Sequence, residues 1–140
     1  MISLNYALAL RQAGLPWRPH ERDCFTVPDG DFDGQIFCLN ELPAMIEFVY
    51  GEPMITFHGS SEWALDHLIT SEAVWLPSES QLREHLERLL GAGHWFEFKR
   101  TIHGYQCAIE GFTSQSTNAE DTYALMIIHL LQQRTLPLEE

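Results

Sequence analysis

Apolar residues recur along the chain with two different periods, and the alternation between these periods predicts the order of the elements. Near the N-terminus, Leu4, Ala7 and Leu8 lie about one helical turn apart, and Gly14 and Pro16 end the run. Four short segments rich in aromatic and β-branched residues follow, separated by turn sequences, at residues 24–27, 35–39, 44–50 and 54–58. The pattern predicts one helix and then four antiparallel strands.

Two helices are predicted in the middle of the chain. A window without Gly or Pro follows a serine and predicts a helix from its apolar residues, Trp63, Leu65, Leu68 and Ile69. A capping box, in which Ser78 and Gln81 each bond the backbone amide of the other, predicts that the next helix begins there, and Gly91 ends it. One face of this helix is apolar, formed by Leu82, Leu86, Leu89 and Leu90.

The last helix is predicted at about residues 118–133. A second capping box, Thr117 with Glu120, marks its start. The helix is apolar on nearly every side, so it needs cover on more than one face. Two alternatives meet that need: the helix lies centrally within one chain, or a second copy of the protein covers one side and forms a homodimer through the C-terminal helix.

A predicted hairpin at residues 95–102 and 105–110, with Phe96 and Phe98 on one face, completes the elements. Short turns join consecutive strands, which disfavours parallel βαβ units. We therefore predict an α+β fold in a single compact domain over residues 1–140. Its antiparallel sheet has about six strands, and about four helices pack mainly on one face of the sheet.

The net charge limits the partners of the protein. The chain has 20 Asp and Glu residues against 8 Lys and Arg residues, a formal net charge of −12. Such a chain repels phosphate backbones and anionic lipids, and its sequence presents no basic stripe, so we expect neither a nucleic-acid partner nor a membrane. A basic protein partner is electrostatically favoured, although the same charge also keeps a small domain in solution.

The cysteines and the apolar runs bear on the cellular compartment. Cys24, Cys38 and Cys107 are odd in number and lack a CxxC spacing, and the N-terminus lacks the basic start and long apolar run of a signal peptide. We therefore predict a cytoplasmic protein with reduced thiols. The longest largely apolar run, residues 124–131, is far shorter than the roughly 20 residues that a bilayer span needs.

Residues 29–41 contain a candidate calcium site. Three aspartates match positions 1, 3 and 5 of an EF-hand loop, and Gly34 matches position 6: Asp29, Asp31 and Asp33. Position 12 should supply a glutamate but is Asn40, and a strand-like segment precedes the loop where a helix should run. Asp and Gly are also ordinary residues of hairpin loops. The stretch favours a hairpin loop, with weak calcium binding as the alternative, and we expect no cofactor.

Two further groups of residues resemble parts of catalytic sites. Ser60 and Ser61 stand where a strand passes into a predicted helix, but neither has the flanking glycines of a nucleophile elbow, and a helix cap explains them. His20 and Cys24 are four residues apart, but Pro19 and the extended character of the segment disfavour the helical register that would join a base to a thiol. We predict no catalytic residue, which leaves enzymatic activity open while favouring its absence.

The remaining histidines and the tryptophans have no spacing that points to a site. The histidines show neither HxH nor HxxxH spacing, so a zinc site would need distant parts of the chain: His67, His85, His94, His103 and His129. His129 is expected to be a hydrogen-bonded core residue. The tryptophans are expected to fill corners of a small core, with a ligand pocket as the alternative: Trp17, Trp63, Trp75 and Trp95.

The chain resembles a group of small uncharacterised bacterial proteins in the stretches ALALRQAGLPWRPHERDCF, TFHGSSEWALD and WLPSESQLREHLERLL. In that group a short helix leads to GLPW, strands follow, and WLP precedes a helix that contains QL. Some members carry an automatic label that relates them to pilus assembly. The resemblance covers most of the chain and implies one compact domain with no assigned chemistry. It does not extend to an ATPase, because the sequence has no GxxxxGK[ST].

Acidity, small size and the missing catalytic constellation together predict a non-enzymatic binding or accessory protein that acts on another protein, with a basic partner favoured. An alternative is a small-molecule-binding protein or an enzyme whose pocket lies between sheet and helices, since many active sites leave no local pattern. A second alternative is a weak calcium-binding loop at residues 29–41.

Overall fold

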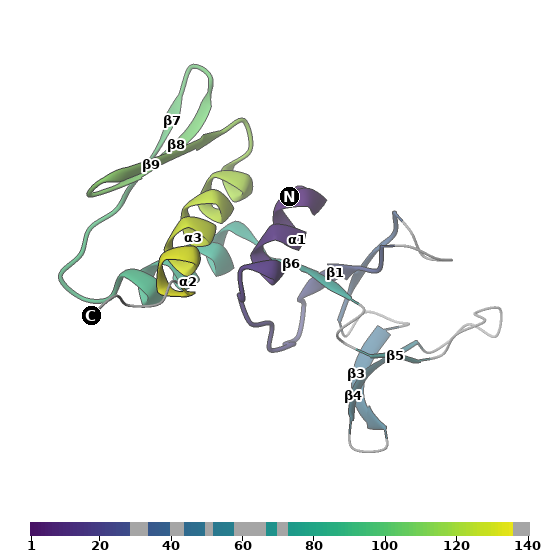
Figure 1. Cartoon of the computed structure of the whole chain (residues 1–140). Helices are drawn as coiled ribbons and strands as arrows, with labels where there is room; N and C mark the ends of the chain where they lie inside the picture. Colours follow the sequence, from purple (N-terminus) through teal and green to yellow (C-terminus); the bar gives the residue numbers. More distant parts are fainter. Residues whose placement is uncertain (29–33, 40–43, 50–51, 58–66, 70–72, 136–140) are drawn as a thin grey trace. The chain divides into compact units, whose positions relative to one another are not determined.

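The computed structural model describes residues 1–28, 34–39, 44–49, 52–57, 67–69 and 73–135 (Figure 1). The chain divides into two compact units. Unit 1 comprises Met1–Pro16 and Pro77–Glu140, and unit 2 comprises Trp17–Leu76. The single compact domain over residues 1–140 stays a prediction.

The described residues of unit 1 form three helices and one sheet: α1 (Leu4–Gln12), α2 (Glu79–Leu90), β7 (Glu97–Thr101), β8 (Gly104–Ile109), β9 (Phe112–Ser116) and α3 (Ala119–Thr135). The three strands are antiparallel in the order β7-β8-β9, and two-residue loops join them. Gly104 allows a close approach between β8 and β9, because a Cβ atom there would lie 2.4 Å from the carbonyl oxygen of Ser116. Its φ of +139° also disfavours any residue with a side chain.

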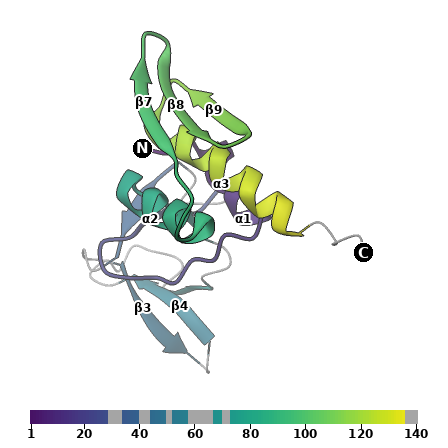
Figure 2. The same cartoon turned by 90° about the vertical axis from the view of Figure 1, so that its left-hand side faces the viewer.

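The helix α3 lies against one face of this sheet and also packs on α1 and α2 (Figures 1 and 2). The rings of Tyr123 and Phe98 stack with their centroids 4.3 Å apart, and Ser114 Oγ donates a hydrogen bond to the carbonyl oxygen of Thr122. Met126 is fully buried. Neighbours within unit 1 therefore supply most of the cover that an all-round apolar helix needs, as the first of the two alternatives requires.

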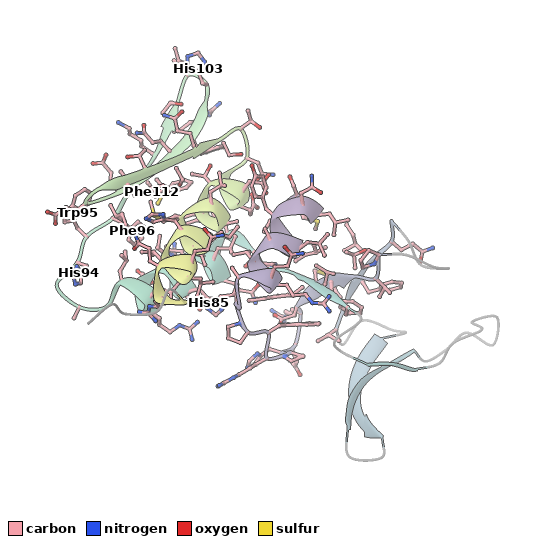
Figure 3. The ribbon with its side chains drawn as sticks, viewed as in Figure 1. His85, His94, Trp95, Phe96, His103 and Phe112 are labelled. Carbon is pink, nitrogen blue, oxygen red and sulfur yellow. A yellow bond between two sulfur atoms is a disulfide. The ribbon has the colours of Figure 1, made fainter. Side chains whose placement is uncertain are left out.

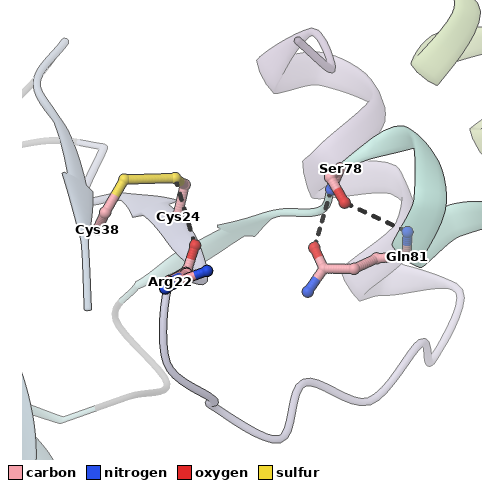
Figure 4. Close-up of a disulfide and its surroundings, with 5 residues drawn as sticks. All are labelled: Arg22, Cys24, Cys38, Ser78 and Gln81. Atoms are coloured by element: carbon pink, nitrogen blue, oxygen red, sulfur yellow. Dashed lines mark hydrogen bonds between the residues drawn. A yellow bond between two sulfur atoms is a disulfide. The ribbon is translucent and has the colours of Figure 1, made fainter. Parts of the chain in front are cut away.

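Two helix starts were predicted from capping boxes, and one of them is confirmed. Ser78 and Gln81 form the reciprocal pair at the start of α2 (Figure 4). The box of Thr117 with Glu120 is wrong. The cap of α3 is Asn118, whose Oδ1 accepts a hydrogen bond from the backbone N–H of Asp121, while Glu120 forms an ion pair with the terminal amine. Asparagine caps a helix as well as serine does and better than threonine, which accounts for the shift by one residue.

A buried carboxylate joins α1 to α3. Asp121 is 4% exposed, and its two oxygens accept hydrogen bonds from the backbone N–H and the hydroxyl of Ser3. Ser3 is also the N-cap residue of α1. A buried carboxylate needs such donors, because desolvation without them is strongly unfavourable. The contact therefore fixes the start of α1 against the first turn of α3.

The described residues of unit 2 form six short strands in two antiparallel sheets: β1 (Cys24–Thr26), β2 (Ile36–Cys38), β3 (Ala44–Val49), β4 (Glu52–Phe57), β5 (His67–Ile69) and β6 (Val74–Leu76). One sheet has the order β2-β1-β6 and the other has the order β3-β4-β5. The core of the first sheet is apolar, since Phe25 and Val74 are fully buried. Sequence position thus fails to give strand order, because β1 has the distant β6 as a neighbour.

The α+β class and the antiparallel pairing are confirmed, but the arrangement differs from the prediction. The described strands form three sheets of three strands instead of one sheet of about six, and the described residues form three helices instead of four. Most of the helix predicted around Trp63 lies outside the described residues. Its last residues, Leu68 and Ile69, form β5, since they pair with Ile55 and Met54 of β4. Pairing with a neighbouring strand has overridden a weak local preference for helix.

No helix within the described ranges is long and apolar enough to cross a membrane.

The cap of α3 can be tested by substitution. Asn118→Ala should lower the free energy of unfolding by about 1 kcal/mol, because the first turn of α3 loses its side-chain acceptor. Thr117→Ala is the matched control at the neighbouring exposed position, where a change within about 0.5 kcal/mol is expected. Denaturant titration monitored by circular dichroism measures both. A larger loss of stability for Thr117→Ala than for Asn118→Ala would show that Thr117, the residue predicted from the sequence, caps α3.

Candidate functional site

The segment between Trp17 and β1 is organised around Asp23, a carboxylate that is 3% exposed. Asp23 Oδ2 accepts hydrogen bonds from Trp17 Nε1 and from the backbone N–H of His20, both at 3.0 Å. The carbonyl of Asp23 accepts a hydrogen bond from the backbone N–H of Leu39. Arg22, just before it, has a φ of +71°, a conformation that non-glycine residues adopt only when their surroundings hold them. Asp23 therefore acts as a structural anchor for this segment.

The tryptophan of the GLPW sequence joins an aromatic cluster in unit 2. The rings of Trp17 and Trp75 are nearly parallel, with centroids 6.3 Å apart, and Trp17 also contacts Phe25. Phe25 in turn stacks on Phe37 of the neighbouring strand. Each such pair stabilises the fold by about 0.5–1.5 kcal/mol beyond area burial. Trp17 and Trp75, both partly buried, thus pack at the edge of the core, as predicted, whereas Trp95 of unit 1 is 56% exposed.

Cys24 and Cys38 are joined by a disulfide, so the prediction of reduced thiols is corrected for this pair (Figure 4). The two residues lie directly opposite each other on β1 and β2, with Cα atoms 4.2 Å apart. The sulfur of Cys24 lies 3.9 Å from the carbonyl oxygen of Arg22, but a disulfide sulfur has no proton to donate. His20 Nδ1 lies 2.5 Å from the carbonyl oxygen of Arg18. Cys24 thus has no free thiol for His20 to activate.

The sequence contained a signal for this disulfide. Residues 24–27 and 35–39 were both predicted to be strands, separated by the hairpin loop at residues 28–34, and Cys24 and Cys38 stand at equal distances from the middle of that loop. Pairing Thr26 with Ile36 then places the two cysteines opposite each other. Cysteine spacing alone misses this pair, because the register of the hairpin brings the two residues together.

The third cysteine lies in the core of unit 1. Cys107 of β8 is a free thiol with no exposed surface, and burial raises its pKa to about 11. Its neighbour on the same sheet face, Phe98, stacks on Tyr123 of α3. Burial, reinforced by the carboxylate of Glu79, raises the pKa of Tyr123 to about 12. Both groups are protonated at neutral pH, so neither is poised as a nucleophile or a base.

The four described histidines of unit 1 lie on different elements, and Figure 3 labels three of them, His85, His94 and His103. Burial, and next the charge of Arg88, lowers the pKa of His85 on α2. His94 and His103 are exposed in loops before and after β7. His129 stacks on Phe112 of β9 with ring centroids 3.7 Å apart, so its contact is aromatic, where a hydrogen bond was expected. Within the described ranges, no three His, Cys, Asp or Glu side chains are grouped closely enough to hold a metal ion.

Several candidates from the sequence lie outside the described residues: Asp29, Asp31, Asp33, Ser60, Ser61 and Trp63. The segments that flank the aspartates are described. They are antiparallel strands in register, with Thr26 opposite Ile36, and this confirms that the stretch links a hairpin. A strand precedes it where an EF-hand has a helix. Calcium binding by the aspartates stays a prediction.

Charge divides unevenly between the two units. Unit 2 has eleven Asp and Glu residues against Arg18 and Arg22, a formal net charge of −9 in 60 residues. Unit 1 has nine acidic against six basic residues, a net charge of −3 in 80 residues. Asp23 is the one carboxylate of unit 2 that the structure shows to be buried within hydrogen bonds, and Glu21 is exposed. The strongest electrostatic feature of the chain therefore belongs to unit 2.

Comparisons with known proteins leave the family open: no family model matches the chain, and neither a curated protein nor a solved structure matches it.

The disulfide can be tested by counting thiols. Without a reducing agent, the unfolded protein should show one reactive thiol, that of Cys107, and three after reduction. The native protein should show none, because Cys107 is buried. Ellman's reagent measures all three states. Three thiols in the unreduced, unfolded protein would contradict the bond.

Loss of this bond should also destabilise the protein. Closing a loop of this length lowers the entropy of the unfolded chain, which corresponds to about 3 kcal/mol. The double variant with Cys24→Ser and Cys38→Ser should therefore have a free energy of unfolding lower by about 3 kcal/mol. Dithiothreitol should destabilise the native sequence by the same amount and leave the double variant unchanged, which separates the bond from any effect of serine itself.

The two raised pKa values predict that unit 1 loses stability in alkali. The unfolded chain releases the protons of Cys107 and Tyr123 near pH 9 and 10, whereas the folded state holds them to about 11 and 12. Stability is therefore full below pH 9 and falls with rising pH, by about 1.4 kcal/mol per pH unit for each group. Denaturant titrations between pH 8 and 11 measure the slope. Cys107→Ala should abolish the loss of stability between pH 9 and 10. If the loss is unchanged in this variant, groups other than Cys107 cause it.

Proposed function

We propose that the protein is a non-enzymatic accessory protein that binds a basic protein partner, chiefly through unit 2. The observation that carries this proposal is the net charge of −9 on Trp17–Leu76, where two arginines stand against eleven carboxylates. Such a density of one sign speeds the encounter with an oppositely charged partner and selects against nucleic acids and anionic lipids. Like charges also destabilise a folded unit, so a surface of this kind has a cost in stability that binding would offset.

The state of the three cysteines and of Asp23 agrees with a binding role. Cys24 is held in a disulfide, and Cys107 is buried with a raised pKa. The carboxylate of Asp23 accepts hydrogen bonds from Trp17 and His20 of its own segment, which gives it a structural role. The resemblance to a bacterial group with a pilus-assembly label and the cytoplasmic location both stay proposals. The Cys24–Cys38 disulfide weighs against the location, because such bonds are rare in the cytoplasm.

The test begins with the native complex. The tagged protein, purified gently from its own host, should be recovered in native mass spectrometry with a basic protein bound in a fixed ratio. The same measurement reports bound calcium or a bound metabolite, which the two alternative functions require. Recovery of the bare chain alone, as one copy or two, would count against a stable partner.

Matched variants then test whether the charge of unit 2 determines binding. Glu21→Gln, Glu47→Gln and Glu52→Gln together remove three negative charges from unit 2, and should weaken binding about tenfold or more while reducing its salt dependence. The control removes the same number of charges from the exposed side of α2 in unit 1, at Glu79, Glu84 and Glu87. This control should retain binding. Equal losses in the two triple variants would show that net charge, without a defined surface, determines affinity.

A further inference from the structure

The two edge strands of the unit 1 sheet differ in charge. Within the part of the chain that the structure describes, β7 and β9 each pair with β8 on one side only. The strand β7 carries three charged residues among its five, Glu97, Lys99 and Arg100, and charges of this kind protect an edge from pairing with another chain. The strand β9, Phe112–Ser116, has no charged residue and no proline. It is therefore the unprotected edge of the sheet.

The loop between β8 and β9 determines which backbone groups of β9 point away from the sheet. Ile109 and Phe112 flank a two-residue loop and pair in register, as do the alternate pairs along the two strands. In such a hairpin the flanking pair exchanges hydrogen bonds and every second pair does not. Thr113 and Gln115 belong to the second kind, so their N–H and C=O groups point outward. Both side chains are exposed on the face of the sheet opposite α3.

The outward-pointing backbone groups of Thr113 and Gln115 can pair with the same groups of a second copy. A twofold axis through Ser114 would place Thr113 opposite Gln115 of a second copy, and Gln115 opposite its Thr113. Both pairs then join residues whose backbone groups point outward, as an antiparallel hydrogen-bonded pair requires. The corresponding axis through the middle of β7 would place Lys99 opposite Lys99, which is unfavourable. Charge therefore selects β9 over β7 as the edge at which two identical chains meet.

The β9 edge continues onto a partly exposed side of α3. Ser114 bonds to Thr122, and Phe112 stacks on His129, so this length of α3 lies beneath β9. Leu125, one turn before His129 on the same side of the helix, is only partly buried. Apolar surface thus adjoins the free edge, and it would supply the hydrophobic contact that strand pairing alone lacks.

We infer that β9, with the adjoining side of α3, is the surface through which two copies of this chain associate, by antiparallel β9–β9 pairing into one six-stranded sheet. The partner is a second copy, because the surface is uncharged and matches itself about Ser114, whereas a basic partner is attracted to unit 2. This inference goes beyond the proposed function and does not depend on it.

Substitutions at Thr113 and Gln115 test both the surface and its register. Sedimentation equilibrium over a concentration series should give the native chain twice its monomer mass of 16.1 kDa. The variant with Thr113→Lys and Gln115→Lys places like charges opposite each other at both pairs, and should weaken the dimer about tenfold or more. The variant with Thr113→Lys and Gln115→Glu places opposite charges there, and should restore the dimer.

The matched control is Glu97→Lys, which changes the net charge by the same +2 as the double lysine variant but lies on the β7 edge. It should dimerise like the native chain. Far-UV circular dichroism verifies the fold of each variant, and all substituted side chains are exposed. A monomeric native chain, an undiminished dimer in the double lysine variant, an equal loss in Glu97→Lys, or no recovery in the lysine–glutamate variant would each overturn the inference.

Discussion

The folding of unit 1 depends on excluding water from almost the whole circumference of α3. This helix carries apolar side chains on nearly every side, so no single neighbour can cover it. The sheet face of Phe98 covers one side, where Tyr123 stacks, and α1 and α2 cover others. The contact of Ser3 with the buried carboxylate of Asp121 then holds α1 in place. Burial that protects α3 also keeps Cys107 and Tyr123 protonated, and hence chemically inert at neutral pH.

Unit 2 meets a different constraint, since its strands β1, β2 and β6 have three residues each and bury little apolar surface. Three kinds of interaction reinforce that sheet: a cross-strand disulfide, a ladder of stacked aromatic rings, and the hydrogen bonds that converge on Asp23. Each of them replaces hydrophobic area with a specific link. The same unit carries most of the net charge, whose mutual repulsion these links must withstand.

The two proposals assign different surfaces to different partners on one physical criterion, the density of charge. The acidic unit 2 would attract a basic protein, and its self-repulsion would oppose contact between two copies there. The uncharged β9 edge lacks that repulsion and has outward-pointing backbone groups at Thr113 and Gln115. Each proposed surface therefore belongs to one unit and is matched to a partner of a different charge.

Local patterns in the sequence were sufficient for much of the secondary structure. Helix periodicity gave α1, α2 and α3, the Ser78–Gln81 pair fixed a helix start, and the alternating segments gave β1 to β4, β7 and β8. These features depend on residues a few positions apart, and so the sequence by itself determined them. Strand partners, the Cys24–Cys38 bond, the conversion of Leu68 and Ile69 to strand, and the shift of a cap to Asn118 were decided by the tertiary structure. The physical reason is that register and burial depend on which distant segment lies alongside, and no spacing along the chain specifies that neighbour.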